Sequence, residues 1–87
     1  MARIRSAVLR IDYVVTLHAK QELQEDELTL LELEKILLDG TIVERQTDLK
    51  TGEAKYRVRG SIPGEEVEAI VKFGPDDCPV IITVYTL

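Results

Sequence analysis

The residue types most able to do chemistry in this chain alternate along one short segment. Residues 55–59 read Lys-Tyr-Arg-Val-Arg. If the segment is an extended strand, successive side chains point to opposite faces, so Lys55, Arg57 and Arg59 stand in one row about 7 Å apart. Three aligned cations suit a phosphate backbone or an acidic partner. They also suit an ordinary solvated strand face, and the pattern alone does not separate these interpretations.

Other polar side chains join this row as candidates. Thr83 and Tyr85 of the last expected strand would lie on the same sheet face, with Arg45 or one of its neighbours beside them. Arginine can neutralise charge on a pentavalent phosphate, while lysine or tyrosine can transfer a proton. His18 is the single histidine, and its ordinary pKa near neutrality makes it a candidate acid or base. The alternative is a structural His18 that packs where a helix begins.

The remaining reactive groups match no familiar site. The acids of residues 22–27 lack the Asp-x-Asp spacing of a calcium loop and are typical of a solvated helix end. Cys78 is the single cysteine and has no His or Lys beside it in sequence to stabilise a thiolate. One Cys and one His are too few ligands for a structural zinc site, and no Gly-rich phosphate loop is present. We therefore expect no metal and no cofactor.

Composition limits the class of protein. The chain has 87 residues, of which 45% are hydrophobic and 31% charged, which is typical of a single domain over residues 1–87. No apolar run approaches the roughly 18 residues that a membrane helix needs, and the first residues do not resemble a signal peptide. A lone cysteine agrees with a reducing compartment. We therefore expect a cytoplasmic protein with no membrane partner.

The net charge of −5 is unevenly distributed along the chain. Residues 1–20 and 41–60 are net basic, whereas residues 21–40 and 61–87 are net acidic. Because salt screens charges beyond about 8–10 Å, a basic segment keeps a local positive field on an acidic protein. Overall acidity therefore disfavours nucleic-acid binding without excluding it.

The elements that must position these residues divide the chain into a helical part, residues 1–40, and an antiparallel meander, residues 41–87. The clearest helix covers 30–39, because Thr29 and Glu32 have the spacing of a capping box. Asp39-Gly40 then ends it. The other expected elements are helices over 3–10 and 18–25, an extended lead-in or edge strand over 13–17, strands over 41–46, 54–59, 66–73 and 80–85, and turns over 60–64 and 74–79.

Short loops between these strands force neighbours to run antiparallel. We therefore predict an α+β fold in which two or three N-terminal helices pack on one face of a four-stranded antiparallel sheet. The helix-covered face would hold the core, and the other face would carry the cation row. The expected core residues of the sheet are Tyr56, Val58, Val67, Ala69, Val71, Ile82 and Val84.

Several short motifs follow one another in a characteristic order. They are Thr16-Leu-His18-Ala19, a Leu-Thr helix start at 28–29, Leu38-Asp-Gly40-Thr-Ile-Val-Glu, Lys55-Tyr56 and Val80-Ile-Ile-Thr-Val-Tyr85. Over roughly residues 13–86, this order resembles the bacterial family called domain of unknown function 4258. That family is similar to the RelE, BrnT and MqsR type of toxin, which are small ribonucleases with N-terminal helices over an antiparallel sheet. Its members are often encoded beside a small zinc-finger protein of the MqsA type.

The resemblance implies a RelE-like fold and a metal-independent endoribonuclease that is the toxin of a type II toxin–antitoxin pair. RNA and a small zinc-finger antitoxin are the implied partners. His18 matches the family histidine, Lys55 and Tyr56 match a basic-aromatic pair, and Thr83 and Tyr85 match the closing strand. Together with the cation row, this assigns catalysis to His18, Lys55, Arg57 and Tyr85, and RNA phosphate binding to Arg45, Arg59 and Thr83.

Two other functions stay open at this point. Many relatives carry an arginine shortly after the His-Ala pair, where this chain has Lys20-Gln-Glu-Leu-Gln. This departure favours a non-catalytic RelE-like interaction module that binds an acidic or antitoxin-like protein. The third hypothesis is a homodimer, because the apolar strand Val80–Tyr85 would accept another strand if it lay at a sheet edge.

Overall fold

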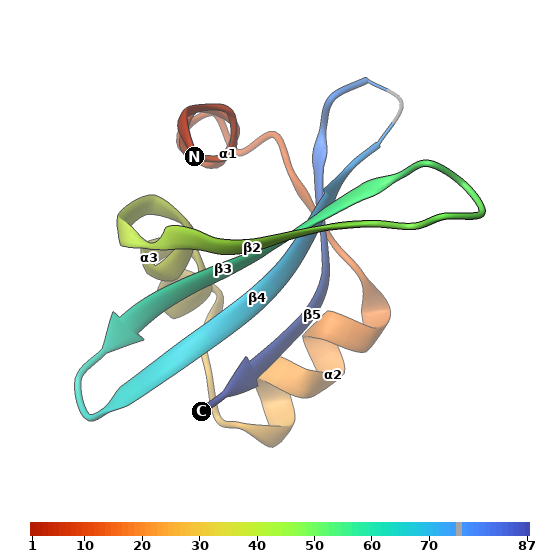
Figure 1. Ribbon diagram of the computed structural model, residues 1–87. Coiled ribbons are helices and arrows are strands. Elements are labelled where there is room, and N and C mark those ends of the chain that lie inside the picture. Colours follow the sequence, from red (N-terminus) through yellow and green to blue (C-terminus); the bar gives the residue numbers. More distant parts are fainter. Residues whose placement is uncertain (75) are drawn as a thin grey trace.

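Alternating apolar and polar residues in the second half of the chain form most of a mixed sheet, and helices precede these strands (Figure 1). A computed structural model describes residues 1–74 and 76–87. The elements in chain order are α1 (Ala2–Leu9), β1 (Val14–Val15), α2 (Leu17–Glu25), α3 (Leu30–Asp39), β2 (Thr41–Thr47), β3 (Ala54–Ile62), β4 (Glu65–Phe73) and β5 (Pro79–Thr86). The strand order is β1-β5-β4-β3-β2, with β1 parallel to β5 and the other pairs antiparallel.

The predicted α+β class and the meander β2–β5 are confirmed, but among residues 1–74 and 76–87 the sheet has five strands rather than four. Val14 and Val15 form the additional strand, which pairs in parallel with Val80 and Ile81. A two-residue segment carries too little alternation to reveal such a distant partner. The expected lead-in over 13–17 is therefore partly an edge strand.

Helix α3 has the predicted bounds and the predicted capping box. The Thr29 hydroxyl accepts the Glu32 N–H at 3.1 Å, and the Glu32 carboxylate accepts the Thr29 N–H at 2.9 Å. Its buried side chains are Leu33, Ile36 and Leu37, and the helix packs on β3. At ten residues α3 is the longest helix, and no helix in the described residues has the length and apolarity to cross a membrane.

Strand β3 is longer than its basic segment predicts. The sequence places Gly60 in a turn, but β3 continues through Ile62 and the turn falls at residues 63–64. A Cβ atom at Gly60 would lie 2.9 Å from the Ile36 Cα, so this glycine permits the close approach of α3 to the strand. The turn expected over 74–79 includes Pro75, which lies outside the described residues; Gly74 N–H donates to the Cys78 carbonyl at 2.8 Å.

Helix α2 covers the part of β5 that β1 leaves unpaired. The Thr16 hydroxyl caps the helix by accepting the Ala19 N–H at 3.1 Å. One turn further on, Glu22 Oε1 accepts the N–H of Val84 at 3.0 Å. With β4 on its other side, β5 is an interior strand (Figure 1). A homodimer through Val80–Tyr85 would require β5 to be a free edge strand, and β5 does not have this position.

A β-bulge in β2 decides which of its side chains face the helices. The register with β3 shifts between Ile42 and Glu44, so Val43 is an extra residue. The shift puts Glu44 on the face away from the helices and Arg45 opposite Tyr56 on the helix-covered face. The expected position of Arg45 beside the cation row is therefore wrong, because one inserted residue reverses the alternation.

A second bulge decides which isoleucine of β5 faces the core. Its register with β4 shifts between Ile70 and Val71, which leaves Ile82 as the extra residue. Ile81, at 0% exposed, fills the core in place of the expected Ile82, which is half-buried. Tyr56 is also only half-buried, while the other expected core residues of the sheet are buried: Val58, Val67, Ala69, Val71 and Val84.

Helix α1 ends with an isoleucine in the left-handed conformation. Ile11 has φ 55°, its N–H donates to the Val8 carbonyl at 3.0 Å, and the Asp12 N–H donates to the Ala7 carbonyl at 2.8 Å. This is the Schellman motif, whose left-handed position glycine usually occupies. Ile11 is 80% exposed, so burial does not offset the steric cost of its Cβ.

We expect Ile11→Gly to stabilise the fold. Relief of a strain of about 1–2 kcal/mol exceeds the entropic cost of glycine of about 0.5–1 kcal/mol. The thermal midpoint should therefore rise by about 4 °C. Ile11→Ala keeps the Cβ and is the matched control, with a smaller gain. A lower midpoint for Ile11→Gly than for the unchanged chain would contradict the strain.

Candidate functional site

The sheet face turned away from α1 and α3, called the open face from here on, carries the predicted cation row. Strand pairing keeps Lys55, Arg57 and Arg59 on this face, as the alternation predicts. Their neighbours across the sheet complete three rungs. The first rung is Gln46, Lys55, Lys72 and Val80, the second is Glu44, Arg57, Ile70 and Thr83, and the third is Thr41, Arg59, Glu68 and Tyr85.

A buried carboxylate lies at the centre of the third rung. Glu68 is 1% exposed. Arg59 Nε and Nη2 lie 2.7 and 2.6 Å from Glu68 Oε2. The Tyr85 hydroxyl donates to the other carboxylate oxygen, and Arg57 Nη1 lies 3.6 Å from it. Glu68 thus joins three of the predicted site residues into one cluster.

Sequence reasoning did not single out Glu68, because the alternation of β4 places it among solvent-facing acids. Only the long side chains of the neighbouring strands bury it. The available signal was its position: in a meander with this turn, Glu68 must lie opposite Arg59. Because the turn was expected over 60–64 rather than 63–64, pairing the expected strands would have set another residue opposite Arg59.

The cluster fixes the charges of its members. Burial alone would raise the pKa of Glu68, but hydrogen bonds from Tyr85 and Arg59 and the charges of both arginines lower it below the ordinary value of 4.5. The hydrogen bond to Glu68, followed by burial, raises the pKa of Tyr85 above its ordinary 10.0. At neutral pH the carboxylate is therefore ionised and the phenol keeps its proton.

Arg57 is the least satisfied member of the cluster. Its guanidinium lies 3.6 Å from both Glu68 and Glu44, which is an ion-pair distance too long for a hydrogen bond. Its Nε is buried and has no hydrogen-bond partner among residues 1–74 and 76–87. Its interaction with the Tyr85 hydroxyl raises the pKa of Arg57, so the cation is permanent. On the open face the terminal nitrogens of Arg57 therefore make only long ion pairs.

His18 belongs to a second polar group at the end of the middle rung. His18 Nε2 lies 3.3 Å from Glu22 Oε1, and the Thr83 hydroxyl donates to the same oxygen. Thr83 shares its rung with Arg57, which lies two strand spacings or about 10 Å away across the sheet. The fold thus brings the histidine to the same sheet face as the cation row.

The structure separates one predicted residue from the others. Arg45 Nε lies 3.4 Å from the Tyr56 hydroxyl, and its guanidinium stands 5.9 Å from the Tyr56 ring on the helix-covered face. The remaining predicted residues lie on or beside the open face: Arg57, Arg59 and Tyr85 around Glu68, Thr83 and His18 with Glu22, and Lys55 on the first rung.

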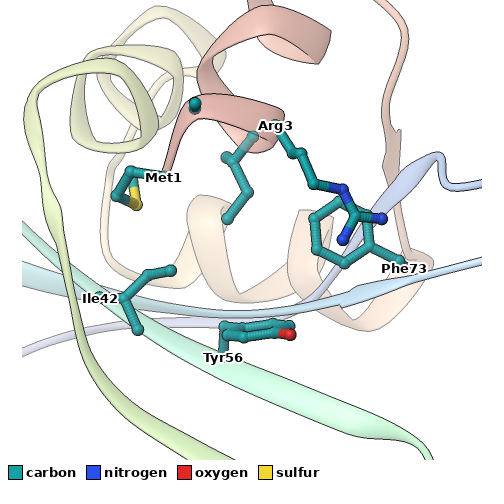
Figure 2. A pocket seen from close by; sticks show the side chains of 7 residues that line it. Met1, Arg3, Ile42, Tyr56 and Phe73 are labelled. Carbon is teal, nitrogen blue, oxygen red and sulfur yellow. The ribbon is translucent and has the colours of Figure 1, made fainter.

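A hollow on the helix-covered face does not contribute to this site. It encloses about 240 Å³ between α1 and the sheet, and Figure 2 shows Met1, Ile42 and Tyr56 around it. The Arg3 guanidinium covers the Phe73 ring at 4.1 Å at one side. Its lining is mostly apolar, and the sheet separates it from the open face.

Cys78 also lies outside the open face. Its sulfur is 3.5 Å from the Asp12 carbonyl oxygen, in the loop between β4 and β5. Burial, followed by the charge of Asp12, raises the pKa of the Cys78 thiol. The group is therefore a protonated thiol at neutral pH and a poor nucleophile.

Comparison with known proteins identifies a family whose model matches most of the chain. A family model described as Domain of unknown function (DUF4258) matches residues 15–86. The match extends from β1 to the end of β5 and includes every residue of the three rungs. No curated protein and no solved structure matches the chain.

We expect Glu68→Gln to destabilise the fold, because it leaves Arg57 and Arg59 without their shared counter-ion. Both arginines are about one-third exposed or more, so solvent screens part of the effect. The free energy of unfolding should fall by about 2 kcal/mol near neutral pH in urea denaturation. Glu66→Gln, an exposed acid of the same strand and face, is the matched control and should change it by less than about 0.5 kcal/mol.

The effect of Glu68→Gln should disappear in acid. Because the folded pKa of Glu68 lies below its unfolded value, ionised Glu68 stabilises the fold above its ordinary pKa of 4.5. This stabilisation is lost as the pH falls through the folded pKa, where the stabilities of the variant and the unchanged chain should converge. A difference that stays constant with pH would show that Glu68 acts by shape rather than by charge.

Proposed function

Because this chain belongs to the DUF4258 family, whose description names no activity, we propose from its open face that it binds and cleaves RNA phosphodiesters without a metal ion. In this proposal the chain is the toxin of a type II toxin–antitoxin pair with a RelE-like fold. Its partner is a small zinc-finger antitoxin, and it acts in the cytoplasm.

The position and bonding of Arg57 support this proposal more than any other observation. Its side chain is 34% exposed in the middle of the open face, and both of its ion pairs, at 3.6 Å, are too long for hydrogen bonds. A phosphate offers the oxygen acceptors that such a guanidinium lacks. Arg59, fixed by Glu68, stands on the adjacent rung and adds a second charge.

The proposed reaction is transesterification by the RNA itself. The 2′-oxygen bonds to phosphorus as its proton passes to a base, the P–O5′ bond breaks, and the 5′-oxygen takes up a proton. The products are a 2′,3′-cyclic phosphate and a 5′-hydroxyl. Arg57 and Arg59 stabilise the charge that develops on the phosphate, and His18 transfers protons from its position beside Glu22.

Glu68 and Tyr85 have a positioning role in this mechanism. The carboxylate is 1% exposed and cannot meet a 2′-hydroxyl without movement of the arginines above it. It instead holds Arg59 in a fixed orientation and keeps Arg57 beside it. Lys55 lies one rung away and contributes charge next to the reacting phosphate.

We expect Arg57→Ala to lower RNA cleavage by about 10²–10³-fold, because it removes one stabiliser of the transition-state charge. Cleavage of single-stranded RNA by the purified chain should continue in EDTA and leave cyclic phosphate ends. Arg45→Ala is the matched control, since Arg45 lies on the other face of the sheet. In cells, expression of the unchanged chain should arrest growth, and Arg57→Ala or the neighbouring gene should relieve the arrest.

A folded, purified chain that leaves RNA intact and does not arrest growth would end the ribonuclease proposal. One observation favours the second candidate, a non-catalytic interaction module. Glu68 and Glu44 already neutralise the two arginines, and the protein is acidic overall, with an isoelectric point near 4.8. This candidate predicts a salt-sensitive complex with an acidic or antitoxin-like protein, weakened by Arg57→Ala, and no loss of RNA.

A further inference from the structure

Two lysines face each other on the first rung of the open face. Lys55 and Lys72 are directly opposite across β3 and β4, and both are half-buried. Like charges in this position destabilise an antiparallel pair. Lys72 Nζ lies 3.7 Å from Glu53 Oε2, with side chains 34% and 50% exposed, so this ion pair contributes little. Lys55 makes no ion pair within the part of the chain that the structure describes.

The lysine pair is adjacent to the arginine cluster. Lys55 precedes Arg57 by two residues of β3, a distance of about 7 Å along the strand on the same face. This spacing is close to that of successive phosphates in an extended single strand of nucleic acid. A hollow of about 500 Å³ lies beside Lys72, lined also by Glu53, Phe73, Gly74 and Val80, and leaves room for a nucleotide there.

We propose that Lys55 and Lys72 form a second phosphate site, which holds the phosphate next to the one bound at Arg57 in single-stranded RNA. The ligand class rests on the proposed function, and the lysine pair itself rests on the strand register. A phosphodiester between the two ammonium groups attracts both of them, and its single negative charge offsets their mutual repulsion. The bound strand then runs along β3, as single strands follow a positively charged groove.

The test uses an RNA that cannot be cleaved, with 2′-O-methyl groups throughout and a fluorescent label, so that binding is measured apart from chemistry. Binding of the unchanged chain is compared with that of Lys55→Gln/Lys72→Gln over a range of salt concentrations. Loss of the one phosphate contact at the lysine site should reduce the slope of log affinity against log salt by about 0.7. Lys35→Gln, an exposed lysine on α3, is the matched control and should leave the slope unchanged.

Short RNA ligands show which phosphate site the lysine substitutions affect. A dinucleoside monophosphate has a single phosphate, which occupies the Arg57 site, so the lysine substitutions should leave its affinity unchanged. A trinucleotide has two phosphates and should bind the unchanged chain more tightly than the double variant. Equal affinities for the trinucleotide would overturn the second site.

The folding of the double variant is monitored by its thermal midpoint, which should not fall, because the substitutions remove a like-charge repulsion. A double variant with the same salt slope as Lys35→Gln rejects the lysine site even if the unchanged chain cleaves RNA. A chain that shows the lysine-dependent slope but cleaves no RNA rejects the ribonuclease and keeps the site. A chain that does not bind the uncleavable RNA rejects the site outright.

Discussion

The antiparallel register of β3 and β4 is the constraint on which the rest of the structure depends. It sets Val58 opposite Ala69 in the core and Arg59 opposite Glu68 on the open face. A slip of one residue would send charged side chains into the core, because side chains alternate along a strand. The ion pair between Arg59 and Glu68, in which two arginine nitrogens contact one carboxylate oxygen, favours the same register as apolar burial does, so electrostatics and packing select one arrangement.

The cations of the open face differ in how tightly the protein's own carboxylates bind them. Arg59 is bound to the buried Glu68 through two nitrogens, so its main role is to stabilise the pairing of β3 and β4. Arg57 is held only at the longer distance of 3.6 Å from two carboxylates. Lys55 lies at the other end of the row, opposite another lysine rather than a carboxylate. An acidic protein can therefore present a basic strip, because its one buried neutralising carboxylate, Glu68, lies at one end of the strip.

Local signals predicted those parts of the fold that depend on residues close in sequence. The Thr29 and Glu32 pair located α3, since a capping box requires four residues only. The alternation of β4 predicted which of its faces is buried. The position of Arg45 could not be predicted in this way, because the bulge at Val43 is a feature of pairing with β3. Gly60 was predicted to be a turn residue, although it lies within β3, where the absence of a side chain permits the close approach of α3.

The sequence by itself determined the class of fold, the alignment of Lys55, Arg57 and Arg59, and membership in the family. These follow from periodicity and motif order, which operate over short distances along the chain. The tertiary structure decided that Glu68 is buried beneath that row and that Glu22 joins His18 to Thr83. Both outcomes require side chains from separate elements to meet. The exposure of the cations and the carboxylates that they contact therefore follow from packing rather than from their spacing in sequence.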